Sequence, residues 1–233
     1  MQQKLPGHVA IIMDGNRRWA NAHNLPPYKG HEVGAERVHE IIREHFSRGM
    51  GHLTVWAASI DNLLKRSRTE VDFLVRVLVK ETERMLASEE FMANEIRVRF
   101  IGRGKEIVKS RELDAAIGKV EERTAHFKKG AFTVLFGYDG REEMIAAIKS
   151  FEKDPVKTLD YDALLKRLWT GVLPPVDYVI RTGGEPHWSS GFMMWHAAES
   201  QLYFTDTLWP DFSAKEYGKA LDEYGTRERR QGK

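Results

Sequence analysis

Six short segments of the chain are apolar on consecutive positions and rich in Val, Ile, Phe and Tyr. Strands that are covered on both faces have this pattern, whereas a half-exposed strand alternates apolar and polar positions. The segments therefore predict six buried strands, at residues 8–14, 52–59, 96–102, 132–138, 176–182 and 201–207.

Amphipathic stretches fill the sequence between these strands. Apolar side chains recur at helical spacing in residues 33–48, and Gly49 can end that helix. Similar patterns predict helices at 69–89, 105–127, 142–151, 161–169 and 214–229. Alternating strands and helices are typical of a mostly parallel six-stranded α/β sheet flanked by helices. We find no internal repeat, and the prolines punctuate loops, so we expect a single domain over residues 1–233.

The composition of the chain argues against several classes of protein, namely nucleic-acid-binding, disulfide-bonded and membrane-spanning proteins. Hydrophobic residues make up 42% of the 233 residues, which is enough for a substantial core, and the net charge is only +2. That small charge gives no reason to expect a nucleic-acid partner. The absence of cysteine excludes disulfides and thiolate metal sites, and we find no signal peptide and no apolar run of roughly 20 residues that could span a bilayer. We therefore expect a cytoplasmic protein.

Polar, glycine-containing segments follow four of the predicted strands, at residues 14–19, 59–62, 138–141 and 181–185. Ligands bind at the carboxyl ends of parallel strands, so the four segments should meet in one cleft. Glycines let backbone N–H groups approach oxyanions, and arginine forks pair with phosphate oxygens. A carboxylate among such arginines, Asp14, suits Mg²⁺, which binds one or two carboxylates together with substrate phosphates. The mixture indicates a diphosphate site.

Each feature also has a simpler interpretation. Residues 14–16 could be an ordinary turn, and a lone histidine such as His31 is more often structural than functional. The dipole of a following helix disfavours Arg17 and Arg18 at its start, which argues for a bound anion there. No Walker loop, no G-x-G-x-x-G after a strand and no G-x-S-x-G elbow occurs, so a nucleotide cofactor or a serine hydrolase is not expected. The apolar face of residues 69–89 fits either core packing or the wall of a lipid tunnel, and the sequence leaves both open.

The segment His-Val-Ala-Ile-Ile-Met-Asp-Gly-Asn-Arg-Arg-Trp-Ala at residues 8–20 resembles the signature of the cis-prenyltransferases. The resemblance continues in the expected order at residues 30–34, 181–185, 202–205, 208–212 and 227–232. It implies an enzyme that condenses isopentenyl diphosphate with an allylic diphosphate such as farnesyl diphosphate. The product would be a cis-polyprenyl diphosphate such as undecaprenyl diphosphate. It also implies Mg²⁺, a hydrophobic tunnel, a homodimer and peripheral contact with a membrane.

The resemblance assigns roles to individual residues. Asp14 would be the essential carboxylate that handles Mg²⁺, and Asn62 would take part in proton removal. The allylic diphosphate would be bound by Gly15, Asn16, Arg17, Arg18, Trp19, His31, Ser59, Ile60, Asp61, Leu63, Lys65 and Arg66. Isopentenyl diphosphate would be bound by Arg181, His187, Trp188, Ser189 and, across a dimer, Arg230 and Gly232.

Several positions depart from the family pattern. Gln201 stands where the family has a glutamate that contacts magnesium, and a neutral amide is a poorer ligand for a hard cation. His187 stands where an arginine is usual, and Pro26 and Pro27 stand near another expected arginine. Three outcomes stay open: a fully active variant, an enzyme with an unusual acceptor or chain length, or a catalytically weak subunit that needs a partner. We favour the first, because the segment around Asp14 is intact.

Overall fold

Six parallel strands form one continuous sheet in the computed structural model, which describes residues 4–227. Their order across the sheet is β3-β4-β2-β1-β5-β6, and each neighbouring pair is parallel. The strands are β1 (His8–Ile12), β2 (His52–Ser59), β3 (Ile96–Ile101), β4 (Gly130–Tyr138), β5 (Tyr178–Arg181) and β6 (Gln201–Phe204). The predicted six-stranded α/β fold is confirmed.

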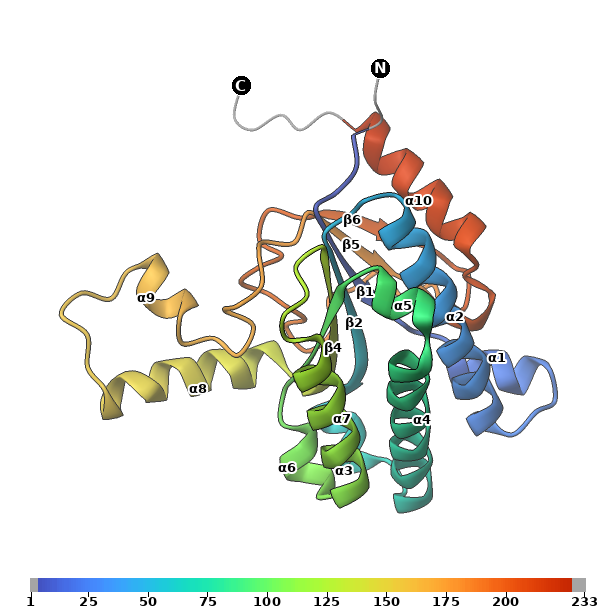
Figure 1. Cartoon of the computed structure of the whole chain (residues 1–233), viewed down its shortest axis with the longest axis horizontal. Helices are drawn as coiled ribbons and strands as arrows, with labels where there is room; N and C mark the ends of the chain where they lie inside the picture. Colours follow the sequence, from blue (N-terminus) through green and yellow to red (C-terminus); the bar gives the residue numbers. More distant parts are fainter. Residues whose placement is uncertain (1–3, 228–233) are drawn as a thin grey trace.

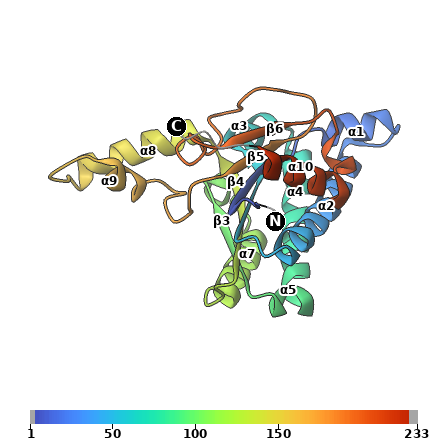
Figure 2. The ribbon, with the colours of Figure 1, turned by 90° about the horizontal axis from the view of Figure 1, so that it is seen from above.

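Helices cover the sheet and extend beyond it (Figure 1). They are α1 (Asn16–Ala22), α2 (Pro27–Ser47), α3 (Ile60–Lys65), α4 (Arg68–Ala87), α5 (Glu89–Ala93), α6 (Gly104–Val108), α7 (Arg111–Thr124), α8 (Gly140–Lys153), α9 (Tyr161–Leu165) and α10 (Ala214–Thr226), with a 3₁₀ turn η1 (Trp209–Asp211). Seen from above in Figure 2, α8 and α9 form an arm that projects from one side of the sheet.

The central strand β1 is buried along its whole length, as its apolar sequence predicts. Val9 and Ile11 join the larger core cluster, to which α2 and α10 also contribute, whereas Ala10 and Ile12 join a second cluster with residues of the 169–197 segment. This division follows from the two-residue period of a strand. A third cluster joins α4 and α7 to the carboxyl ends of β2 and β4.

The prediction of one helix at 105–127 is wrong, because the chain forms α6 and α7 there. Lys109 has a left-handed backbone (φ 54°) that ends α6. Ser110 then caps α7 by accepting a hydrogen bond from the N–H of Leu113 (3.3 Å). The sequence pattern also missed the short helices α1 and α3, which lie directly after β1 and β2.

Candidate active site

The loop after β1 carries Asp14 to the carboxyl edge of the sheet. The Asp14 backbone N–H donates to Thr182 Oγ1 (3.0 Å), and its carbonyl accepts from the N–H of Trp209 (2.9 Å). Gly15 follows with φ 109°, and a Cβ there would lie 2.8 Å from Leu208 Cδ2, so the turn requires glycine. Three separate parts of the chain therefore hold this carboxylate in position.

Two arginines flank the Asp14 side chain. Arg181 Nη2 lies 3.1 Å from Oδ2, and Arg18 Nη2 lies 3.2 Å from Oδ1. Arg181 is only 5% exposed, and its Nη1 donates to Ser189 Oγ (2.6 Å) and to the carbonyl of His187 (2.7 Å). One buried guanidinium thus joins Asp14 to the loop predicted to hold the second substrate.

A second group of cations lies on the α1–α4 side of the same site. Burial, and then the charges of Arg66 and Arg17, lower the pKa of His31 to about 4. Burial and the charge of Arg17 also lower the pKa of Arg66. The Glu70 carboxylate, whose Oε1 lies 3.7 Å from Arg17 Nη1, offsets part of this positive charge. The charged forms of His31 and Arg66 are therefore disfavoured in the free protein, and a bound anion would stabilise them.

The start of α3 brings Ser59 and Asn62 to the rim. Ser59 Oγ accepts from the N–H of Asn62 (2.9 Å), and Asn62 Oδ1 accepts from the N–H of Ser59 (3.3 Å). This reciprocal pair is a capping box, and it orients both side chains beside Asp61 in the wall of the cavity.

These charged groups open into a cavity of about 670 Å³. Its polar lining includes Asp14, Asn16, Arg17, Arg18, His31, Ser59, Asp61, Asn62, Arg66, Arg181, Glu185 and Ser189. Its apolar lining includes Val38, Val55, Leu74, Leu78, Met85, Phe100, Phe132 and Val134. The lining residues Phe132 and Ser59 mark the length of this cavity along the sheet. Phe132 is level with Leu53 of β2, and Ser59 lies six residues further along that strand, so the cavity follows the sheet for roughly 20 Å. The structure therefore connects the predicted diphosphate site to a cavity long enough for an extended hydrocarbon.

Other predicted site residues point elsewhere. Trp19 Nε1 donates to Asp211 Oδ1 (2.7 Å), and its ring stacks on His23. Leu63 is buried in the cluster beneath α4 and α7, and Lys65 pairs with Asp61 (2.7 Å) at the surface. Ile60, Trp188 and the His187 side chain are likewise not among the residues of the 4–227 range that line the cavity.

Gln201 lies at the opposite end of the sheet from Asp14. Gln201 of β6 pairs with Tyr178 of β5, and Tyr178 pairs with Val9 of β1. Gln201 is therefore level with Val9, which precedes Asp14 by five positions. That is roughly 17 Å along the strand direction, too far for shared coordination within one chain. The predicted residues Arg230 and Gly232 lie outside the described residues.

The structure adds lining residues that the sequence analysis missed. Ser190 lies at the mouth beside Glu185, whose segment 181–185 was predicted to reach the cleft, and three polar residues, His39, Glu81 and Thr82, lie among apolar ones along α2 and α4. The sequence shows that His39, Glu81 and Thr82 share a helix face with apolar residues such as Val38, Leu78 and Met85. It does not show that this face lines a cavity.

Neither a metal cluster nor a membrane-spanning helix is present within residues 4–227. No group of three His, Asp or Glu side chains converges there to hold a metal. No helix in that range is long and apolar enough to cross a bilayer.

Comparison with known proteins gives consistent matches. The sequence profile of the family described as "Putative undecaprenyl diphosphate synthase" matches residues 12–232. An isoprenyl transferase of Thermus thermophilus is 37% identical over 98% of this chain and 89% of its own length. A tritrans,polycis-undecaprenyl-diphosphate synthase (geranylgeranyl-diphosphate specific) of Pyrococcus horikoshii is 35% identical over 98% of this chain and 88% of its own. The crystal structure of lavandulyl diphosphate synthase from Lavandula x intermedia with dimethylallyl diphosphate superposes with a TM-score of 0.89 at 30% identity, covering 98% of this chain and 99% of that one.

Proposed function

This chain belongs to the undecaprenyl diphosphate synthase family of prenyltransferases, and on that premise we propose that it extends an allylic diphosphate with isopentenyl diphosphate in cis. The product is a polyprenyl diphosphate such as undecaprenyl diphosphate, and farnesyl diphosphate is a suitable primer. One observation carries the proposal: Asp14 lies between Arg18 and Arg181 at the mouth of a long, largely apolar cavity.

The allylic diphosphate occupies the side of the mouth formed by α1, α2 and α3. Arg17 and Arg66 supply positive charge there, and His31, which burial and these two arginines keep neutral by lowering its pKa to about 4, offers a ring N–H as a donor. The hydrocarbon tail of the primer extends along the apolar walls contributed by α4 and β2. At about 0.8 kcal/mol for each buried CH₂, tail burial adds substantially to binding.

Isopentenyl diphosphate occupies the side formed by Arg181 and Ser189. The two groups already hydrogen-bond to each other, and a buried arginine gives paired donors to phosphate oxygens. We assign His187 to this diphosphate as a further donor from just outside the cavity lining, because its Nε2 lies 3.0 Å from Ser189 Oγ. Arg230 and Gly232 complete the site from a second subunit.

Mg²⁺ fits the donors present at Asp14. The Asp14 side chain lines the cavity and is 34% exposed, so its oxygens can also reach a bound ion. Glu185 lies on the other side of Arg18, which is 3.2 Å from Asp14 and 4.0 Å from Glu185. A single protein carboxylate with diphosphate oxygens is a common magnesium donor set. When bound, the ion supplies charge neutralisation for the leaving diphosphate. Gln201, at the other end of β6, is not part of that set within one chain.

The residues of the mouth account for the chemistry of condensation. The bond from the allylic carbon to its diphosphate breaks, and the electron pair leaves with the diphosphate. Arg17 and Arg18 stabilise that developing charge. The double bond of isopentenyl diphosphate, aligned by Arg181, attacks the allylic carbon, and a proton then leaves the new chain. Asn62 orients the atoms that lose the proton, and the oxygens of the released diphosphate, a far stronger base than an amide, accept it.

A homodimer and a peripheral membrane contact complete the proposal. Exposed apolar side chains on and near the projecting α8–α9 arm, among them Ile145, Ile148, Leu159 and Tyr161, support a subunit interface. Leu25 and Tyr28, exposed between α1 and the end of the first turn of α2, are suited to the surface of a bilayer that receives the lipid from a cytoplasmic enzyme.

The direct test is incubation of the purified protein with Mg²⁺, labelled isopentenyl diphosphate and a panel of allylic diphosphates, followed by mass spectrometry. We expect extended diphosphates that differ by five-carbon units. Diphosphate binding without product, with turnover restored only by a second, different chain, would instead identify a weak subunit of a complex. No incorporation with any primer and no partner-dependent activity would refute both.

A further inference from the structure

Two cavities meet between α2 and α4, and the second also reaches the surface, because the exposed side chains of Arg43 and Glu90 help to line it. The main cavity of about 670 Å³ ends near Met85, and a second cavity of about 190 Å³ lies beyond it. His39 and Met85 line both. The second cavity has a mixed lining: Ile42, Phe46, Met85, Phe91 and Ile96 offer a hydrocarbon tail an apolar path, and His39, Arg43, Arg84, Ser88, Glu90 and Asn94 make up the polar part.

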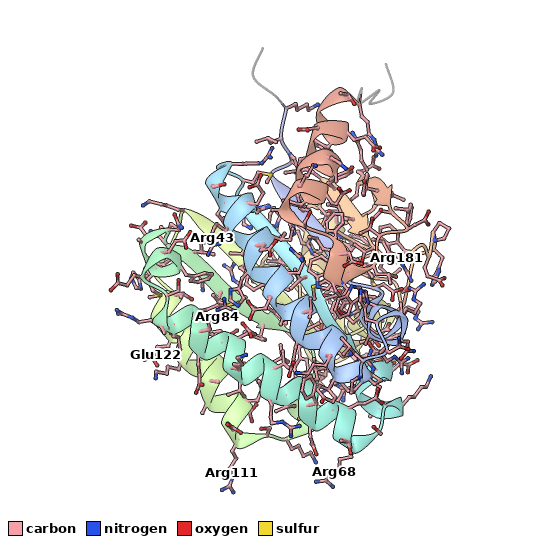
Figure 3. All side chains as sticks on the ribbon, turned by 90° about the vertical axis from the view of Figure 1, so that its right-hand side faces the viewer. Arg43, Arg68, Arg84, Arg111, Glu122 and Arg181 are labelled. Atoms are coloured by element: carbon pink, nitrogen blue, oxygen red, sulfur yellow. The ribbon has the colours of Figure 1, made fainter. Side chains whose placement is uncertain are left out.

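A hydrogen-bonded pair, His39 and Glu81, lies where the two cavities meet. The Nε2–H of His39 on α2 donates to Glu81 on α4. The two side chains are only 16% and 12% exposed. Arg84 on α4, labelled in Figure 3, approaches Glu81 at 3.6 Å and also binds Glu36 of α2 at 2.7 Å. The pair links the two helices that form the cavity wall.

The structure favours the charged form of the Glu81 carboxylate although apolar side chains such as Leu78 and Met85 line the same cavity. Burial by itself raises the pKa of Glu81, but the hydrogen bond from His39 and the charges of His39, Arg84 and Lys80 outweigh it and lower the pKa overall. A hydrocarbon chain that passed between His39 and Glu81 would separate the two and leave a charge against apolar atoms. That arrangement is strongly unfavourable.

We propose that the His39–Glu81 pair, backed by Met85, is the floor of the hydrocarbon cavity and limits the length of chain that the enzyme makes. The inference rests on the proposed prenyl-transfer function and adds a specificity determinant to it. A chain grows until its tail reaches the pair. Opening the pair joins the second cavity to the first and allows further condensations.

The test compares product lengths of three variants. In His39→Ala/Glu81→Ala both partners are removed, so no unpaired charge is left, and we expect products longer by one or more isoprene units. In His39→Phe/Glu81→Leu the space is refilled with apolar groups, and the length should return to that of the wild type. Glu36→Ala is the matched control, because it breaks another α2–α4 contact but lines neither cavity, and its product length should not change.

A binding series separates this inference from the proposed function, because it needs no turnover. Affinity for linear alkyl diphosphates of increasing length should rise by about fourfold per methylene and then level off when the tail reaches the floor. In the double alanine variant the plateau should begin at a longer chain. An unchanged plateau and unchanged product length in a folded double alanine variant would overturn the inference, as would equal lengthening in Glu36→Ala. Failure of the wild type to make any product would count against the proposed function alone.

Discussion

Both ends of the parallel sheet carry histidines and aspartates, but these residues have different surroundings at the two ends. At the amino end, His8 Nδ1 lies 3.0 Å from the carbonyl oxygen of Pro174, His8 Nε2 lies 2.8 Å from Thr54 Oγ1, and Asp177 accepts from the backbone N–H groups of Gly7 and His8. These polar groups are satisfied by the protein itself. At the carboxyl end, clustered cations surround a cavity.

The polar residues at the amino end of the sheet therefore serve mainly stability, and those at the carboxyl end serve mainly function. Buried polar groups that find protein partners help to specify a unique fold. At the carboxyl end, burial and then neighbouring arginine charge lower the pKa values of His31 and Arg66, so these groups are held in an environment that disfavours their charged forms until an anion binds. A carboxylate or histidine at one end should therefore affect folding, and its counterpart at the other end should affect catalysis.

The largest expected effect is on kcat, which should respond to substitution of Asp14 at the carboxyl end and not of Asp177 at the amino end. Asp14→Asn keeps a hydrogen-bond acceptor for Arg181 but removes the charge at the mouth. We expect kcat to fall by about 10²- to 10³-fold, with little change in Tm. Asp177→Asn is the matched control at the amino end, and it should leave kcat unchanged. Steady-state kinetics and thermal unfolding of both variants check this, and comparable losses of kcat in the two would contradict it.

Acidification should destabilise the fold through the histidines of the amino end. Burial lowers the pKa of His8 to about 4 and that of His45 to about 3, against 6.5 for an exposed histidine. The unfolded chain therefore binds protons that the folded chain does not. Stability is retained above pH 6.5 and falls below it by up to about 1.4 kcal/mol per pH unit for each histidine.

Urea unfolding at pH 7.5, 6.5, 5.5 and 5.0 measures this slope. His45→Gln, which cannot titrate, should reduce it by the share of one histidine. A slope that His45→Gln leaves unchanged would show that other groups control the acid sensitivity.

A smaller effect is expected when the amino-end carboxylate is deleted. Asp177→Ala leaves the N–H groups of Gly7 and His8 without that acceptor, and we expect a loss of about 1–2 kcal/mol in the free energy of unfolding. The folded variant should keep its kcat, as measured at a temperature well below its midpoint. A fall in kcat without a fall in stability would reverse the assignment of the two ends.

The smallest effect is a change in titration without a change in structure. Inorganic diphosphate bound at the mouth stabilises the imidazolium, so it should raise the pKa of His31 by about one unit or more from its value of about 4. Histidine NMR titrations with and without diphosphate measure this. His8 and His45, at the other end, should not respond, and a uniform response of all three would indicate a general effect of the anion.

The sequence by itself determined the fold class and the general location of the site. Strands buried on both faces require unbroken apolar runs, so β1 and its neighbours were recognisable without structure. Parallel strands share a carboxyl edge, which is why the segments that begin at Asp14, Ser59 and Arg181 could be predicted to meet.

Only the tertiary structure decided how individual side chains are used. Trp19 turns to Asp211, Gln201 lies at the far end of its strand, and Lys109 divides a predicted helix in two. His39 and Glu81 meet although 42 residues separate them. Periodicity identifies which face of an element is buried, but the partner of each buried side chain is set by packing between elements that are distant in sequence.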